Sequence, residues 1–290
     1  MLQPSTFSIV AYDAEEDAWG IAVASKFLAV GAVVPWARAG AGAVATQSYA
    51  NTTFGSEGLE LMASGLTAQE TLARLLDADP QSDQRQVGLV DAHGNAATFT
   101  GGACHAWAGG LTGDGFVIQG NILTGEDVIL DMAVEFGRIR EKNIIWRLYG
   151  ALLAGDRAGG DRRGRQSAAI LVVKPNAGYG GFNDIWADYR VDDDPDPVHR
   201  LGEVLELHDL YFGESPVSER VLLSGDSLSH LQEIMKKLGY YAGSIHGQYD
   251  APTRAALEIF TGNENFEERV DLISGSIDRP VIDYLVRRYK

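Results

Sequence analysis

The order of the apolar segments is the feature that most constrains the fold of this chain. Short apolar runs rich in β-branched residues predict strands, and apolar residues spaced about 3.6 apart predict helices. Over the first two hundred residues the order is four strands, two helices, four strands, two helices and two strands. Strands grouped apart from paired helices favour an α+β protein. We predict two packed antiparallel sheets with helices on both outer faces, a four-layer αββα sandwich.

The predicted elements occupy definite stretches of the sequence. Strands are expected at 7–12, 19–24, 29–36 and 41–47, in the hairpin segments 85–101 and 105–123, and at 166–174 and 184–191. Helices are expected at 56–65, 67–79, 125–139, 143–155 and 198–212. Thr67 and Glu70 have the spacing of a capping box, which marks the start of the second helix.

A second, smaller domain is expected after the sandwich. At 290 residues the chain is longer than one average domain. The polar, proline-containing stretch ESPVSER separates two self-contained apolar patterns and has the composition of a linker. We predict a first domain over 1–213 and a small α-helical domain over 214–290.

Charge and composition exclude several classes of protein. The formal net charge of -16 repels phosphate backbones, which argues against a nucleic-acid partner. No stretch approaches the ~20 apolar residues of a membrane span, and the N-terminus lacks the regions of a signal peptide, so we expect a cytoplasmic protein without membrane contact. The single cysteine allows no intramolecular disulfide and no cysteine-based zinc site. The six histidines have no metal-like spacing, so neither a metal nor a cofactor is predicted.

The C-terminal part carries a specific local pattern, LSHLQEIMKKLGYYAGSIHGQYDAPTRAALEIF. It contains an amphipathic helix ending at Gly239, a glycine-punctuated loop, and a second helix that begins around Asp250 and has Pro252 in its first turn. Residues 220–290 resemble peptidoglycan-binding-like domains, although His246 stands where that family usually has Asp. Such domains also serve as docking units, so peptidoglycan is one candidate partner.

The first two hundred residues resemble a bacterial and archaeal family, the domain of unknown function 1028 (DUF1028), which has an Ntn-hydrolase-like fold. The matching segments include TFSIVAYD, GIAVASKFLAVGAVVPWARAGAGAVATQ, GGDRRGRQSAAILVV and GGFNDIWADYRVDDDPDPVHRLGEVLELHDLYF. Some members of that family carry the same kind of C-terminal module. The resemblance implies the four-layer sandwich that the order of elements also predicts.

The Ntn-like resemblance implies a definite chemistry at Thr6. An N-terminal Thr of the first strand attacks an amide carbonyl, and its own α-amine acts as the general base. An α-amine has an ordinary pKa near 7.7–8.0, so it accepts a proton at neutral pH without a histidine. Here Met1 to Ser5 precede Thr6. We therefore expect an active form without these residues, through trimming, self-cleavage after Ser5 or a later start.

Polar residues at other strand ends are further catalytic candidates. Ser25 and Lys26 end the second strand, where Lys26 could lower the effective pKa of a hydroxyl. Gln47, Gln119 and Asn121 are amides at the ends of apolar strands. They are suited either to orienting a substrate amide or an oxyanion, or to satisfying buried hydrogen bonds.

Two loops supply candidates for substrate binding. Cys104 lies in a glycine-rich loop before Trp107 and is either an alternative nucleophile or a buried free cysteine. Asp161, Arg162 and Arg163 form a charged cluster before a strand. It is suited to gripping a substrate carboxylate through a planar guanidinium, or it is a solvent-exposed loop.

Together these features predict an Ntn-type amidohydrolase that acts on a small, carboxylated, amide-containing molecule. The alternative is a non-catalytic binding or scaffold protein with the same fold, associated with the cell wall through its C-terminal domain. A homo-oligomer is expected in either case.

Overall fold

The computed structural model describes residues 6–213, 215 and 219–289. The chain forms two compact units, Met1–Val204 and Leu205–Lys290, and the division falls within helix α5 (Pro197–Phe212). The domain boundary predicted at 213/214 adjoins residue 214, which lies outside the described residues, and it stays a prediction. Most of the predicted linker also lies outside them.

The first unit contains two antiparallel sheets, as predicted. The six-stranded sheet has the spatial order β10 (Ile185–Val191), β9 (Ser167–Val173), β2 (Ala18–Ser25), β1 (Thr6–Asp13), β8 (Phe116–Asn121) and β7 (Gly109–Gly113). The four-stranded sheet has the order β3 (Pro35–Arg38), β4 (Gly42–Ser48), β5 (Arg85–Asp91) and β6 (Ala96–Thr100). The strand and helix order therefore confirms the α+β prediction.

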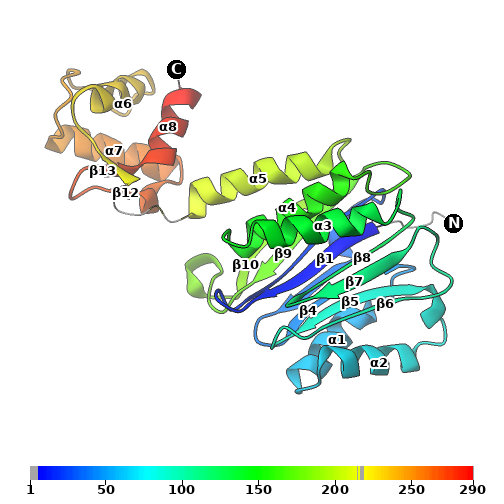
Figure 1. Ribbon diagram of the computed structural model, residues 1–290. Helices are drawn as coiled ribbons and strands as arrows, with labels where there is room; N and C mark the ends of the chain where they lie inside the picture. Colours follow the sequence, from blue (N-terminus) through cyan, green and yellow to red (C-terminus); the bar gives the residue numbers. More distant parts are fainter. Residues whose placement is uncertain (1–5, 214, 216–218, 290) are drawn as a thin grey trace. The chain divides into compact units, whose positions relative to one another are not determined.

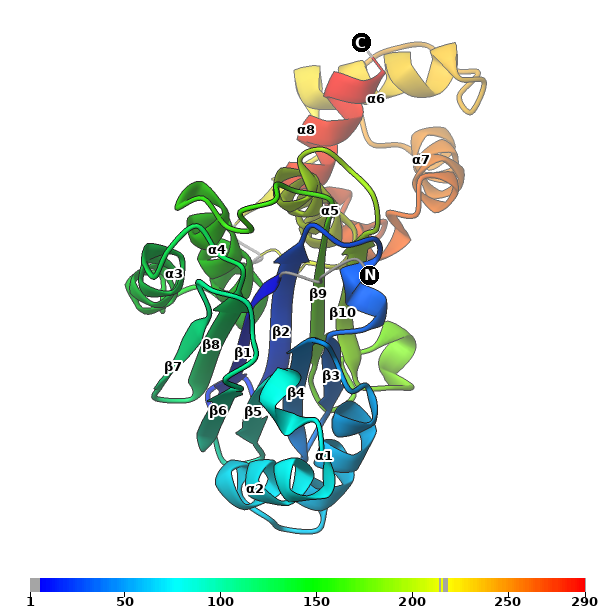
Figure 2. The ribbon, with the colours of Figure 1, turned by 90° about the vertical axis from the view of Figure 1, so that its right-hand side faces the viewer.

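Helix pairs cover the two sheets on their outer faces (Figures 1 and 2). α1 (Thr53–Ala63) and α2 (Ala68–Ala78) pack on the four-stranded sheet. α3 (Asp127–Arg138) and α4 (Ile144–Arg157) pack on the six-stranded sheet. The capping box of α2 is confirmed: the Thr67 amide donates to Glu70 Oε2 at 2.9 Å, and the Glu70 amide donates to Thr67 Oγ1.

The space between the two sheets holds the central apolar core. Its buried members are Val10, Trp19, Ile21, Val23, Val30, Val34, Ala43, Ala45, Val90, Val117, Ala169 and Val173. Because α4 covers the other face of β1 and β2, these strands are buried on both sides. This explains why β2 has the nearly continuous apolar sequence AWGIAVAS.

The strand predicted at 29–36 is wrong. Val30–Ala32 forms a 3₁₀ turn, and β3 begins only at Pro35. Proline has no amide hydrogen to donate to a sheet, so it is placed at strand starts and edges. β3 is the edge strand of its sheet, while Val30 and Val34 reach the core from irregular backbone.

The second unit is not purely helical, which corrects the prediction of an α-helical domain. It contains α6 (Gly225–Lys237), α7 (Ala251–Asn263) and α8 (Arg279–Arg288), together with β11 (Arg220–Leu222), β12 (Val270–Asp271) and β13 (Ser276–Asp278). These strands form a small antiparallel sheet. Strands of two or three residues contain too few alternations to produce a period-2 pattern.

A buried carboxylate joins the elements of the second unit. Asp278 lies between Arg220, with Nε to Oδ1 at 3.0 Å, and Arg269, with Nε to Oδ2 at 2.7 Å. Arg269 also donates from Nη1 to the backbone oxygen of Asp209 at 3.1 Å.

Among the described residues, no helix is both long and apolar enough to span a membrane.

Candidate active site

Three of the predicted catalytic residues meet at one end of adjacent strands. Thr6 is the first residue of β1 and pairs with Ser25 of β2 on one side and with Asn121 of β8 on the other. Its side chain is almost fully buried, and Thr6 Oγ1 donates a hydrogen bond to Ser25 Oγ at 3.2 Å. Antiparallel neighbours bring strand starts and strand ends to the same edge, so two hydroxyls and an amide converge here.

A network of amide side chains lies between the sheets next to Thr6. Gln47 of β4 and Gln86 of β5 face Gln119 and Asn121 of β8, and all four are at most 1% exposed. Gln47 Nε2 donates to Gln86 Oε1 at 2.9 Å, and Asn121 Nδ2 donates to the same oxygen at 2.8 Å. Ser8 of β1 donates to Gln47 Oε1 and accepts from Gln119 Nε2, both at 2.7 Å.

The amide groups of this network donate their hydrogen bonds to other atoms of the protein. Besides Gln86, Gln47 Nε2 lies 3.3 Å from the backbone oxygen of Thr6. Such contacts support the buried hydrogen-bond interpretation of Gln47 and Gln119 over direct contact with substrate. Gln119 Oε1 is buried and has no hydrogen-bond partner among the described residues. A Cβ on Gly88 would lie 2.1 Å from this oxygen, so Gly88 gives Gln119 the room that it needs.

A cavity of about 330 Å³ adjoins Thr6 and Gln47. One wall is apolar and comes from the segment between β2 and β3: Phe27, Val30, Val33 and Val34. The other wall contains Tyr49 and Arg85. Thr6 therefore lines, at the start of its strand, a partly open cavity that has one apolar wall and one polar wall.

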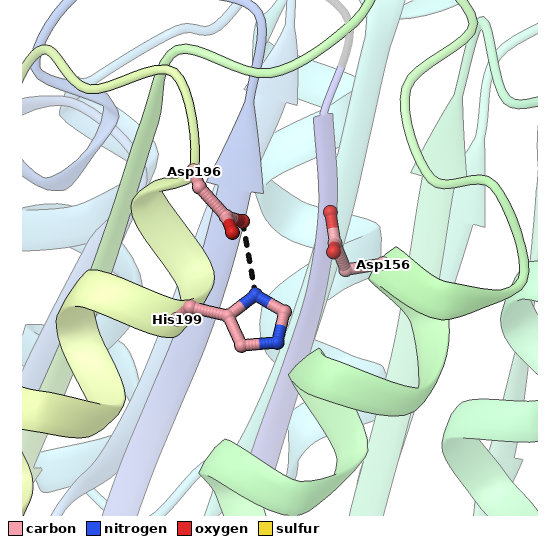
Figure 3. A group of neighbouring side chains, drawn as sticks. All are labelled: Asp156, Asp196 and His199. Carbon is pink, nitrogen blue, oxygen red and sulfur yellow. Dashed lines mark hydrogen bonds and ion pairs between the residues drawn. The ribbon is translucent and has the colours of Figure 1, made fainter.

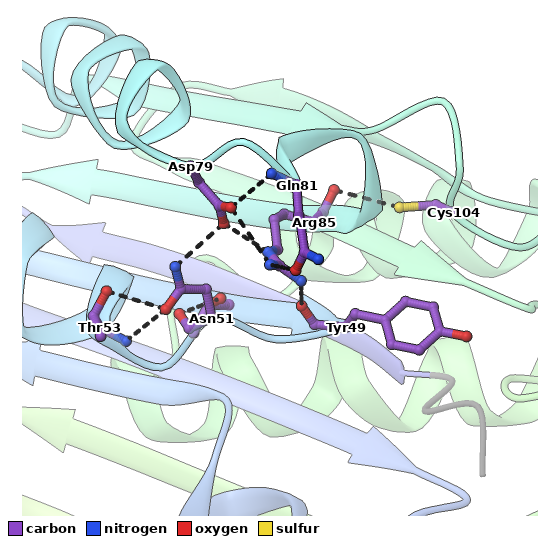
Figure 4. Close-up of polar contacts among 8 residues, drawn as sticks. Tyr49, Asn51, Thr53, Asp79, Gln81, Arg85 and Cys104 are labelled. Atoms are coloured by element: carbon purple, nitrogen blue, oxygen red, sulfur yellow. Dashed lines mark hydrogen bonds and ion pairs between the residues drawn. The ribbon is translucent and has the colours of Figure 1, made fainter. Parts of the chain in front are cut away.

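The charge of Arg85 is compensated inside the protein (Figure 4). Arg85 Nε lies 2.7 Å from Asp79 Oδ2, and Nη1 donates to the backbone oxygen of Tyr49 at 2.6 Å. The hydrogen bond from Arg85 holds the pKa of Asp79 below its ordinary value. Asn51 Nδ2 also donates to Asp79 at 3.2 Å. The ion pair thus fixes the segment from Tyr49 to Asn51 beside the cavity.

Cys104 lies next to this wall without reaching Thr6. Its Sγ donates to the backbone oxygen of Arg85 at 3.3 Å, and the side chain is partly buried. Burial raises the pKa of the Cys104 thiol, which disfavours a thiolate at neutral pH. Trp107 accepts from the amide of Leu123 through its backbone oxygen at 3.0 Å, and its ring packs against Gly109.

A second cavity, of about 490 Å³, adjoins Phe7 and Ser25. Arg162 is exposed and lines it, together with Asp161. Asp161 accepts from the Lys26 amide at 2.6 Å and pairs with Arg163, whose Nη2 lies 3.0 Å from Asp161 Oδ2. The predicted cluster is therefore divided: Arg163 is held by Asp161, while Arg162 faces the cavity.

Lys26 does not approach the Thr6 hydroxyl through its ammonium group. The side chain is exposed, and Nζ donates to the backbone oxygen of Arg165 at 3.1 Å. This contact supports a structural role for Lys26.

Within the part of the chain that the structure describes, one group of potential metal ligands is present, and it lies near the second cavity (Figure 3). Asp156 of α4, Asp196 directly before α5, and His199 of α5 place their ligand atoms within 4.8 Å of one another. Arg165, however, holds both carboxylate oxygens of Asp156, at 2.7 and 2.8 Å. A cation would have to displace this arginine, so the group does not fit a resident metal. The absence of a metal requirement stays a prediction.

Sequence reasoning missed several residues of the site. Gln86 and Ser8 were detectable only as polar residues near the ends of the largely apolar strands RQVGLVD and TFSIVAYD. The ion pair of Arg85 and Asp79 could not be predicted from the sequence, because two charged residues that pair across a loop leave no repeating pattern.

The fold and the site define an α+β protein of two packed antiparallel sheets, with a buried threonine hydroxyl beside a cavity at the start of a central strand. The chain belongs to DUF1028, a family of unknown function, whose model matches residues 6–201. A second family model, "Putative peptidoglycan binding domain", matches residues 211–285. Both matches confirm the resemblances that the sequence motifs predicted.

One similar solved structure is the crystal structure of protein SPO2555 from Silicibacter pomeroyi, which is described under DUF1028 as well. The two chains are 30% identical, and the TM-score is 0.64. The similarity covers 71% of this chain and 86% of that chain. A comparison with curated proteins finds no match.

Proposed function

We propose that this protein is an amidohydrolase of the N-terminal-nucleophile type, with Thr6 as the nucleophile once residues 1–5 are removed. The observation that carries the proposal is the position of the Thr6 hydroxyl, at the start of β1, 3.2 Å from Ser25 Oγ and beside a cavity of about 330 Å³. The family match also begins at residue 6.

The chemistry needs few groups. The Thr6 α-amine takes the hydroxyl proton while Oγ1 attacks the carbonyl carbon of the substrate amide. The proton then passes to the leaving nitrogen, the C–N bond breaks, and the acyl group remains as an ester on Oγ1. Water, deprotonated by the same amine, hydrolyses the ester and restores the hydroxyl. Because the hydroxyl proton goes to the α-amine in this step, Ser25 Oγ, 3.2 Å away, orients Thr6 Oγ1 by donating its own hydroxyl proton to it.

We also propose that the substrate carries a carboxylate on the amine side of the amide bond that is cleaved. Arg163 and Arg165 are paired with Asp161 and Asp156. The guanidinium of Arg162, by contrast, makes no hydrogen bond or ion pair within the described residues, and it lines the cavity next to Ser25. A planar guanidinium can bind a carboxylate through two parallel hydrogen bonds.

The test compares the full-length chain with a chain expressed as Met followed by Thr6, whose mass shows that the Met has been removed. The shortened chain should gain amidase activity, because loss of a general base typically costs about 10²–10⁴-fold in rate. Thr6→Ala in the shortened chain should abolish the activity, and Thr6→Ser should keep part of it. If the full-length chain and the Thr6→Ala variant both turned over the substrate as fast as the shortened chain, the nucleophile would be a residue other than Thr6.

A second candidate is a non-catalytic protein that binds the cell wall, which the match over residues 211–285 favours. Sedimentation of the full-length chain with insoluble peptidoglycan tests it, with cellulose as the control matrix. Depletion by peptidoglycan alone supports this candidate, and a chain that stays in the supernatant contradicts it. The cytoplasmic location and the homo-oligomer stay predictions.

A further inference from the structure

We propose that the cavity beside Thr6 receives the acyl half of the substrate, and that this acyl group is short, apolar and uncharged. The inference rests on the proposed function, because it takes Thr6 as the attacking group. It narrows the substrate class to N-acyl amino acids with a small aliphatic acyl group.

The size and the wall of the cavity support this choice. A volume of about 330 Å³ is at the lower end of what small-molecule pockets usually have. Phe27, Val30, Val33 and Val34 form the apolar wall, and Val30 and Val34 are buried. Such a wall favours aliphatic carbon over polar groups.

The apolar wall is held in place by a buried serine. Ser167 Oγ donates to the backbone oxygen of Phe27 at 2.5 Å and accepts from the Val30 amide at 3.1 Å. The Val33 amide donates to the backbone oxygen of Val30 at 3.1 Å. These bonds fix the turn, so the cavity wall exists before a ligand binds.

The polar side chains that line the cavity provide no uncompensated charge to pair with a charged ligand. Arg85 is neutralised by Asp79, and Gln47 Nε2 donates to protein oxygens. Moving a charged acyl group from water into this space without a partner is costly. A negative charge on the substrate finds its partner in the other cavity, where Arg162 lies.

The two cavities adjoin the two hydroxyl-bearing residues. Thr6 lines the apolar cavity and Ser25 lines the one that contains Arg162, while their oxygens are 3.2 Å apart. A substrate amide at Thr6 would place its acyl side in the apolar cavity, and its carboxylated amine side would extend past Ser25 to reach Arg162.

The first experiment measures kcat/KM of the chain that starts at Thr6 with N-isovalerylglycine, N-acetylglycine, N-succinylglycine and N-β-alanylglycine. The neutral acyl group should be preferred by about 100-fold over both charged groups, since neither charge finds a partner. Val33→Phe should lower the ratio of isovaleryl to acetyl turnover about tenfold by filling the cavity. Val134→Phe, a change of the same kind at an exposed position of α3, should leave that ratio unchanged.

The second experiment separates this inference from the proposed hydrolysis. Calorimetry measures the binding of N-isovalerylglycine and N-succinylglycine to the Thr6→Ala chain, which cannot turn them over. If the Thr6 chain hydrolyses none of the amides while the Ala variant binds the isovaleryl compound more tightly, the proposed hydrolysis is wrong and the cavity assignment stands. If the succinyl compound is preferred, if Val33→Phe leaves the ratio unchanged, or if neither compound binds, the cavity assignment is wrong.

Discussion

Removing the carboxylate of Asp79 should destabilise the first unit strongly. The Asp79 and Arg85 side chains are only 8% and 11% exposed, and their closest atoms are 2.7 Å apart. Without Asp79 the guanidinium keeps the Tyr49 backbone oxygen and Gln81 Oε1 but has no counter-charge. Breaking a buried pair by removing one partner costs about 3–5 kcal/mol. We expect Asp79→Ala to lower the free energy of unfolding by that amount at pH 7.

A matched control uses an exposed pair in the same unit. Arg190 and Asp188 lie 3.1 Å apart, but their side chains are 41% and 34% exposed. Exposed pairs contribute about 0–1 kcal/mol, so Asp188→Ala should have a small effect.

Tryptophan fluorescence during urea unfolding is the suitable assay. All five tryptophans precede residue 205, so the signal reports the first unit alone. The urea midpoint of Asp79→Ala should fall by about 1 M or more, given typical slopes of about 1–3 kcal/mol per M. Equal losses in Asp79→Ala and Asp188→Ala would refute the assigned role of the pair.

The pH dependence gives the same prediction a second check. The hydrogen bond from Arg85 lowers the pKa of Asp79 below its ordinary value of 3.8. The carboxylate therefore contributes stability that is fully present above that value and is lost as the pH falls through the lowered pKa. The difference between the parent chain and Asp79→Ala should be constant near pH 7 and shrink in acid below pH 3.8. A difference that grows on acidification would contradict this reasoning.

Three further predictions concern other parts of the chain. Arg162→Lys should weaken the binding of N-acylglycines about tenfold without changing the Tm, because an ammonium cannot reproduce the planar fork; a lower Tm with unchanged binding would show a structural arginine. Burial raises the pKa of the Cys104 thiol above 9.0, so mass spectrometry should find slow alkylation by iodoacetamide at pH 7 and faster alkylation only in alkaline solution. Asp278→Asn should destabilise the second unit by about 3–5 kcal/mol, since Arg220 and Arg269 lose their shared carboxylate; hydrogen exchange of peptides from this unit in urea follows its unfolding, and unfolding at the parent midpoint would count against the prediction.

The order of elements was predictable because it depends on local patterns. Strands such as β2 and helices such as α2 carry their signal within ten or so residues, through apolar spacing and the Thr67–Glu70 cap. The failures have the opposite cause. Val30 and Val34 are apolar because they fill the core from a turn, and the strands of the second unit, with two or three residues each, contain too few alternations to show a pattern.

Those parts of the candidate site whose proximity depends only on strand pairing could be predicted from the sequence. Thr6, Ser25 and Asn121 lie at the ends of strands that pair, so their proximity follows from the register. The partner of a buried amide depends instead on packing between the two sheets, as the contacts of Gln86 with Gln47 and Asn121 show. No spacing in the sequence encodes those contacts.

The amide network has a consequence for how the two sheets are aligned. Apolar side chains at an interface can exchange neighbours at little cost, so an apolar interface alone would allow one sheet to slide over the other. Ser8 and Asn121 of one sheet donate directional hydrogen bonds to Gln47 and Gln86 of the other, and any displacement would leave buried donors without acceptors. One alignment is therefore selected, and in it Thr6 of one sheet and Gln47 of the other line the same cavity as Val30.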